Sequence, residues 1–170
     1  YRDMNDIQSY VKYANSLPSG MRISTSKQDS LTYIAAEGLY LRGSLDQAQS
    51  AMLNYLQTYP NGAYSSEANY YLAAISAEKG NKTQALSYYR KVIDANNPKF
   101  LENALIYTAN NEFESGDYRA ALSDYSKLAN MARTSANKQT GLLGMVRSQS
   151  KLGNYRDAVK AATDLLADKN

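Results

Sequence analysis

Apolar residues recur at helical spacing on both sides of four glycines along the chain. Intervals of three and four residues place side chains on one face of an α-helix. The pattern around each glycine therefore predicts two helices joined by a tight turn. Around Gly43, the apolar residues are Leu31, Ile34, Ala35 and Leu39 before it, and Ala48, Met52, Leu53 and Leu56 after it.

A short motif repeats at each of these turns. It consists of a glycine, a small or polar residue, several polar positions, and an alanine five residues after the glycine. The glycines are 37, 36 and 37 residues apart, so the unit has a nearly constant length. The copies are GSLDQA from Gly43, GNKTQA from Gly80, GDYRAA from Gly116 and GNYRDA from Gly153.

Each recurring position of the motif has a structural reason. Glycine accepts the left-handed backbone that ends a helix, and the Ser, Asn or Asp after it is suited to cap the next one. Alanine keeps the side chain small where two antiparallel helices cross closely. The three prolines, Pro18, Pro60 and Pro98, are expected between hairpins because proline cannot continue a helix.

The resulting map contains a leading helix followed by four helix pairs. The linker between Pro18 and Leu31 is predicted to be a mobile loop or a processing site, and Gly141 and Gly144 are expected to weaken the helix that contains them. The leading helix is placed at 3–16, and the pairs at 28–42 with 45–58, 64–79 with 82–95, 99–115 with 118–131, and 136–152 with 155–168.

The leading segment opens like the last predicted helix of the chain. YRDMNDIQSYVKY parallels NYRDAVKAATDLL at 154–166, and it carries Ile7, Tyr10, Val11 and Ala14 on one face. We therefore expect it to be the second helix of an earlier, truncated repeat.

The motif resembles that of the tetratricopeptide repeat family. The likeness rests on the glycine, the alanine five residues later, frequent aromatics such as Tyr118 and Tyr125, and the proline between units. It implies an all-α fold, an α-α superhelix of four helix-turn-helix repeats plus the leading helix. The domains would be 1–26, with the leading helix and linker, and repeats at 27–62, 63–98, 99–134 and 135–170. The family's early bulky aromatic is absent, since Thr32, Asn69, Leu105 and Leu142 occupy its place, and the period exceeds the family's usual 34 residues.

A longer stretch around Pro60, between the first and second helix pairs, carries a more specific resemblance. YLQTYPNGAYSSEANYYLAAI, residues 55–75, resembles repeats of bacterial cell-envelope proteins such as the Tol-Pal-associated periplasmic coordinator and the lipoprotein of the outer-membrane assembly machinery. This resemblance favours a periplasmic or outer-membrane-associated location, with a cytoplasmic location as the alternative.

The family resemblance also implies a ligand-binding groove lined by the first helix of each pair. The residues in question lie ten, six and three positions before each turn glycine. The resemblance thus implies a peptide- or protein-binding site at Tyr33, Glu37, Tyr40, Tyr70, Ile106, Asn110, Phe113 and Arg147, with Ala74, Ala77, Leu143 and Ser150 completing the pattern.

Some family members hold a C-terminal carboxylate with a lysine and an asparagine one helical turn apart. The matching pairs here include Ile106 with Asn110 and Leu143 with Arg147, and no lysine occurs in any of them. An internal segment or a folded surface is therefore the expected ligand.

The composition argues against an enzyme. The 170 residues include no histidine, cysteine or tryptophan, which removes thiol nucleophiles, imidazole bases and thiolate or imidazole metal ligands. Glu37, flanked by two tyrosines, is a proton-transfer candidate only if burial raises its pKa, and a hydrogen-bond acceptor otherwise. No catalytic residue, cofactor or metal site is predicted.

The charge and hydropathy of the chain argue against two classes of partner, nucleic acids and membranes. The net charge is only +3, and the basic residues form pairs at helical spacing, such as Arg90 with Lys91 and Arg147 with Lys151, so nucleic-acid binding is not predicted. No apolar run reaches the roughly 18 residues of a spanning helix, so direct membrane insertion is not predicted either.

The function that these patterns favour is a non-catalytic scaffold that binds a peptide or partner protein in a concave groove, within a bacterial cell-envelope assembly. The alternative is a structural spacer, or a segment that self-associates through its terminal repeats within a longer solenoid.

Overall fold

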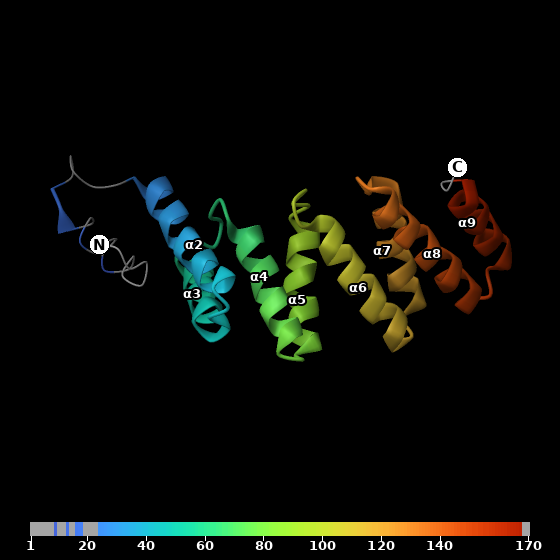
Figure 1. The fold of residues 1–170 in the computed structure, drawn as a ribbon, viewed down its shortest axis with the longest axis horizontal. Helices are drawn as coiled ribbons and strands as arrows, with labels where there is room; N and C mark the ends of the chain where they lie inside the picture. Colours follow the sequence, from blue (N-terminus) through green and yellow to red (C-terminus); the bar gives the residue numbers. More distant parts are fainter. Residues whose placement is uncertain (1–8, 10–12, 14–15, 19–23, 168–170) are drawn as a thin grey trace. The chain divides into compact units, whose positions relative to one another are not determined.

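The computed structural model describes residues 9, 13, 16–18 and 24–167, and this part of the chain is all-α (Figure 1). It contains helix pairs and, within the described residues, no β-strand. The predicted all-α helical-repeat fold is confirmed. The helices are α2 (Thr25–Leu41), α3 (Leu45–Thr58), α4 (Ser65–Glu78), α5 (Lys82–Asp94), α6 (Leu101–Ser115), α7 (Tyr118–Met131), α8 (Ser135–Lys151) and α9 (Tyr155–Ala167).

The chain divides into two compact units, and the boundary along the sequence falls between Lys91 and Val92 inside α5. In the first unit, α3 packs against both α2 and α4, and α2 also reaches α4. In the second unit, α7 packs against α6 and α8, α8 packs against α9, and α6 reaches α8. Within each unit, the first helices of successive pairs therefore lie next to each other.

The four motif glycines form the turns within the helix pairs. Gly43, Gly80, Gly116 and Gly153 all have positive φ, between 75° and 87°, as the left-handed helix end requires. The predicted caps are confirmed at Asn81 and Asp117, which accept hydrogen bonds from the amides of Gln84 and Ala120. Ser44 makes no such side-chain hydrogen bond, so the prediction of a cap was wrong there.

The motif alanines are buried between helices. Ala48, Ala85 and Ala121 have no exposed surface, and Ala158 is also buried. In the second unit, Ala121 packs in one cluster with Ala109 and Tyr125. The small side chain at this position therefore permits the close crossing that the motif predicts.

The start of the first helix pair differs from the sequence-based prediction. The predicted mobile linker extended to Leu31, but α2 already begins at Thr25, and Ser24 caps it by accepting a hydrogen bond from the Lys27 amide. Asp29 is buried against the α3–α4 junction, and this contact fixes the first turns of α2. The predicted leading helix at 3–16 lies mostly outside the described residues.

Two glycines inside α8 mark a close helix crossing. A Cβ atom at Gly141 would lie 2.6 Å from the Ala129 backbone nitrogen, and one at Gly144 would overlap the Tyr125 ring. From the sequence alone, these glycines are predicted only to weaken the helix. In the structure they allow α8 to approach α7, so packing between helices compensates for that cost.

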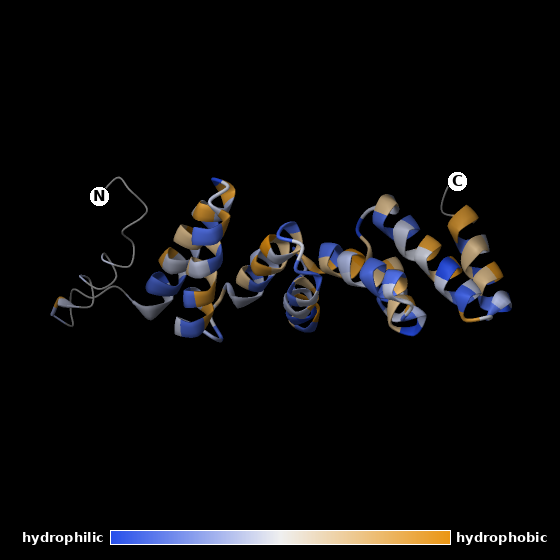
Figure 2. Ribbon diagram, turned by 90° about the horizontal axis from the view of Figure 1, so that it is seen from below, coloured by the Kyte–Doolittle hydropathy of each residue, from blue (hydrophilic) through white to orange (hydrophobic). Residues whose placement is uncertain are grey.

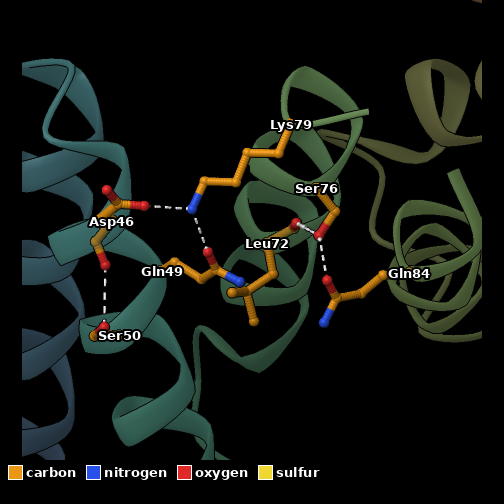
Figure 3. A network of polar contacts seen from close by, with 7 residues as sticks. All are labelled: Asp46, Gln49, Ser50, Leu72, Ser76, Lys79 and Gln84. Carbon is orange, nitrogen blue, oxygen red and sulfur yellow. Dashed lines mark hydrogen bonds and ion pairs between the residues drawn. The ribbon is translucent and has the colours of Figure 1, made fainter. Parts of the chain in front are cut away.

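Polar contacts join three helices of the first unit (Figure 3). The amine of Lys79, the C-cap residue of α4, donates to Asp46 at 2.5 Å and to Gln49 at 2.6 Å, both in α3. Ser76, in α4, donates to Leu72 O in its own helix at 2.7 Å and lies 3.4 Å from Gln84 in α5. These contacts link the α4 segment to α3, the second helix of the preceding pair, and to α5, the second helix of its own pair.

Within the described residues, no helix has the length and apolar character needed to cross a membrane.

Candidate functional site

The first candidate site is a tyrosine-rich surface where α2 and α4 meet. We call it the α2–α4 surface and define it by Glu37 and Tyr40 of α2 with Tyr70, Tyr71 and Glu78 of α4. The Tyr40 and Tyr71 rings lie 4.6 Å apart between centroids, and the Tyr70 and Tyr71 rings lie 5.7 Å apart. Tyr71 is buried, whereas Tyr40, Tyr70 and Glu37 are partly exposed and Glu78 is exposed. The surface therefore combines aromatic rings with carboxylates.

Glu37 holds the α2–α4 surface together. Its Oε1 atom accepts one hydrogen bond from the Tyr33 hydroxyl within α2 and another from the Tyr71 hydroxyl in α4, each 2.8 Å long. Hydrogen bonds to an ionised carboxylate are among the stronger ones in proteins. Glu37 therefore acts as a hydrogen-bond acceptor that joins the two first helices, in agreement with the simpler of its two predicted roles.

The tyrosine hydroxyls of this surface resist ionisation. Burial is the main cause that raises the pKa of Tyr33 and Tyr71, followed in both by the hydrogen bond to Glu37. Burial also raises the pKa of Tyr40, with further contributions from Tyr70 and Glu78. A tyrosinate here would be desolvated and would face a carboxylate, so these hydroxyls stay protonated donors.

Tyr33 differs from the other predicted contact residues because it is buried. Only 3% of its surface is exposed, and its ring is stacked on Tyr64 with centroids 4.4 Å apart and packs edge-on against Tyr55. Tyr33 therefore supports Glu37 from beneath the surface and does not line an open face, which corrects its predicted role.

The second candidate site lies where α6 and α8 meet. We call it the α6–α8 surface and define it by Ile106, Asn110 and Phe113 of α6 with Leu143 and Arg147 of α8. The Arg147 guanidinium carbon lies 4.2 Å from the centre of the Phe113 ring, which is a cation–π contact. Leu143 is 49% exposed, Asn110 and Arg147 are exposed, and Ile106 and Phe113 are partly buried.

Asn110 is held in place from the second helix of its own pair. The Tyr125 hydroxyl donates to Asn110 Oδ1 at 2.6 Å, while the Tyr125 ring is buried between α7 and α8. This bond fixes the side-chain amide with its oxygen toward Tyr125. The Asn110 NH₂ group then remains as the donor that an arriving backbone carbonyl could use.

An open hollow beside the first helix pair has a structural explanation. It is lined by residues of the α2 start and the 59–62 turn, with Asp29 at its polar side. Both Asp29 oxygens are already bonded, Oδ1 to the Tyr55 hydroxyl at 2.5 Å and Oδ2 to the Ala63 amide at 2.8 Å. The carboxylate therefore fastens the junction to α2.

Sequence reasoning missed Tyr71, which links the predicted residues of the α2–α4 surface. Tyr71 bonds Glu37 and touches both Tyr40 and Tyr70. The rule of ten, six and three positions before the turn glycine selects Tyr70 and passes over its neighbour. The available signal was the presence of two adjacent tyrosines, because neighbouring helical residues point to different sides.

A comparison with family models gives one match in the middle of the chain. Residues 67–96, which include most of α4, the Gly80 turn and all of α5, match the model of the tetratricopeptide repeat. The α4–α5 hairpin is similar to a tetratricopeptide repeat. No curated protein matches the chain. Repeats of this family generally mediate protein–protein interaction, and the family fold is a non-catalytic scaffold.

Proposed function

We propose that this protein is a scaffold whose α2–α4 and α6–α8 surfaces bind segments of a partner protein. The observation that carries the proposal is the α6–α8 surface. It presents an exposed leucine, an asparagine amide fixed by Tyr125 and an arginine stacked on Phe113. Apolar area, a donor in a fixed position and an oriented cation are the elements that recognise an extended segment.

The likeness of residues 67–96 to a protein-binding repeat supports the proposal. The buried position of the motif alanines supports it further, because those residues maintain the helix pairs while the first helices leave larger side chains accessible. Among the residues predicted to contact the ligand, Glu37, Tyr40, Tyr70, Ile106, Asn110, Phe113 and Arg147 remain part of the proposal.

Site-specific photo-crosslinking in the native cells tests the proposed function. A photoreactive amino acid in place of Leu143 should capture a defined partner, and the same group in place of Lys127, exposed on α7, should not. Adding Arg147→Glu should abolish the capture from Leu143, whereas Lys127→Glu, the matched charge reversal, should leave it unchanged. Equal capture from both positions, or capture that survives Arg147→Glu, contradicts the proposed surface.

Self-association is the second candidate function, and the last helix favours it. Tyr155, Val159 and Leu166 recur at intervals of four and seven along α9 and are each at least 65% exposed. The hydropathy colouring in Figure 2 shows hydrophobic positions along this last helix. Solvent-exposed apolar residues on one helical face are typical of an unpartnered contact surface. Sedimentation of the chain should then show a concentration-dependent assembly that Val159→Lys with Leu166→Lys abolishes. A monomer at all concentrations contradicts this function.

A role in a bacterial cell-envelope assembly remains the narrower form of the proposal. It rests on the likeness of residues 55–75 to repeats of envelope proteins. The partners identified by crosslinking from Leu143 provide the test, since periplasmic or outer-membrane proteins should dominate them. A set of cytoplasmic partners would contradict the envelope role and leave the scaffold function intact.

A further inference from the structure

The α2–α4 surface places the carboxylates of Glu37 and Glu78 next to aromatic rings. Burial is the main cause that raises the pKa values of Tyr33, Tyr40 and Tyr71, and the neighbouring groups that contribute are carboxylates and other tyrosines. The α6–α8 surface differs, because a cation acts there as well: burial raises the pKa of Tyr125, Arg147 opposes this rise and Glu114 adds to it. The two surfaces therefore suit different side chains of a partner.

Neither Glu37 nor Glu78 forms an ion pair within the part of the chain that the structure describes. Glu37 Oε2 takes part in no hydrogen bond among the described residues, because both tyrosine hydroxyls bond Oε1. Glu67, which also raises the pKa of Tyr33, has an Oε2 atom that is buried and without a hydrogen-bond partner in the described structure. Lys79, the residue next to Glu78, directs its amine to Asp46 and Gln49 of α3 (Figure 3).

We propose that the α2–α4 surface binds an arginine side chain of the partner segment, with the guanidinium placed between Glu37, Glu78 and the rings of Tyr40 and Tyr70. Guanidinium groups bond carboxylates with two parallel donors and stack on aromatic faces. A cation within about 6 Å of a tyrosine ring centre is attracted by its π-electrons. The partly exposed rings of Tyr40 and Tyr70, and a Glu37 oxygen that accepts no hydrogen bond from the described residues, supply both contacts.

This inference deepens the proposed function, since it names the side chain that one of the two surfaces recognises. Its test uses a small probe and no partner protein. The probes are acetyl-arginine amide and acetyl-citrulline amide, which have nearly the same shape and differ in charge. Both are titrated into the isotope-labelled full chain, and amide NMR shifts report where they bind.

The arginine probe should shift the amides around Glu37, Tyr40 and Tyr70, while the citrulline probe at the same concentration should not. Glu78→Gln should weaken binding about two- to fivefold, as expected for the loss of an exposed ion pair. Tyr70→Leu should weaken it by a similar factor, roughly two- to fivefold, through loss of the cation–π contact. Glu37→Gln should weaken it too, and its amide oxygen can still accept from Tyr33 and Tyr71, so the fold is retained.

The matched control is Asp164→Asn on α9, which removes an exposed carboxylate far along the chain and should leave binding unchanged. Equal shifts with both probes, arginine shifts confined to other helices, or binding that withstands Glu37→Gln with Glu78→Gln would each overturn the inference. Because the probe needs no partner, this result can fail while crosslinking from Leu143 succeeds, and the reverse also holds.

Discussion

Gly144 in α8 lies directly against the ring of Tyr125 in α7, and a Cβ atom there would overlap three carbons of that ring. Tyr125 is buried, and its hydroxyl is bonded to Asn110, so the ring cannot move aside without breaking that bond. The same contact therefore sets the α7–α8 distance and the orientation of a residue on the α6–α8 surface.

Gly144→Ala should destabilise the protein although alanine is the better helix former. Overpacking costs about 1–3 kcal/mol, whereas the gain in helix propensity is about 1 kcal/mol, so we expect a net loss. Urea unfolding followed by circular dichroism measures it. Ser150→Ala, an exposed position in the same helix, should change the stability by less than about 0.5 kcal/mol. A variant as stable as the parent chain would show that the helices are not in close contact here.

This glycine shows where sequence reasoning reaches its limit. The repeat period, the turn glycines and the motif alanines are local signals, and they predicted the helix pairs and the buried alanines from the sequence. The reason for Gly144 lies in Tyr125, nineteen residues away, and only the packed helices bring the two together. A glycine inside a helical pattern predicts a less stable helix. Its role in a close helix crossing becomes visible only when the side chain that packs against it is known.

Ala121→Arg should destabilise the second unit by at least about 1–3 kcal/mol, because the position has no exposed surface and cannot hold a longer side chain. Ser123→Arg, two residues away and exposed on the same helix, provides the matched control and should leave the melting temperature nearly unchanged. If both variants have the melting temperature of the parent chain, the pairing of α6 with α7 around this alanine is wrong.

Tyr55→Phe should cost about 1–3 kcal/mol, since it removes a buried hydroxyl that serves two partners. That hydroxyl donates to Asp29 at 2.5 Å and accepts from the Tyr64 amide at 3.0 Å. Tyr59→Phe, which removes a hydroxyl four residues later, should cost less in the same urea titration. Equal stabilities of the two variants would mean that Asp29 does not depend on Tyr55.

The candidate site was predictable to the extent that helical register determines it. Counting from the turn glycines found Tyr40, Tyr70, Phe113 and Arg147, which do lie on first helices and keep part of their surface exposed. The same count could not show that Tyr33 is buried while the other residues are accessible. Tyr33 is covered by Tyr64, which belongs to the loop after the next helix. Asp29 was overlooked for a similar reason, since its partners come from the 55–63 segment.

Alkaline pH should destabilise the first unit. Tyr33 and Tyr71 have pKa values raised above the usual value of about 10, so above that pH the unfolded chain loses protons that the folded chain retains. Stability contributed by these hydroxyls is thus fully present below about pH 10 and falls as the pH rises further. Urea unfolding at about pH 8 and about pH 11 measures the loss.

Tyr71→Phe identifies the group responsible. The variant should be less stable than the parent chain near neutral pH, because Glu37 loses one of its two donors, and it should lose less stability on going to alkaline pH. Tyr155→Phe, at an exposed position on α9, should keep the full alkaline loss of the parent chain. The opposite outcome is that the two variants lose the same amount of stability between about pH 8 and about pH 11. In that case the protonated hydroxyl of Tyr71 is not what Glu37 requires to join α2 to α4.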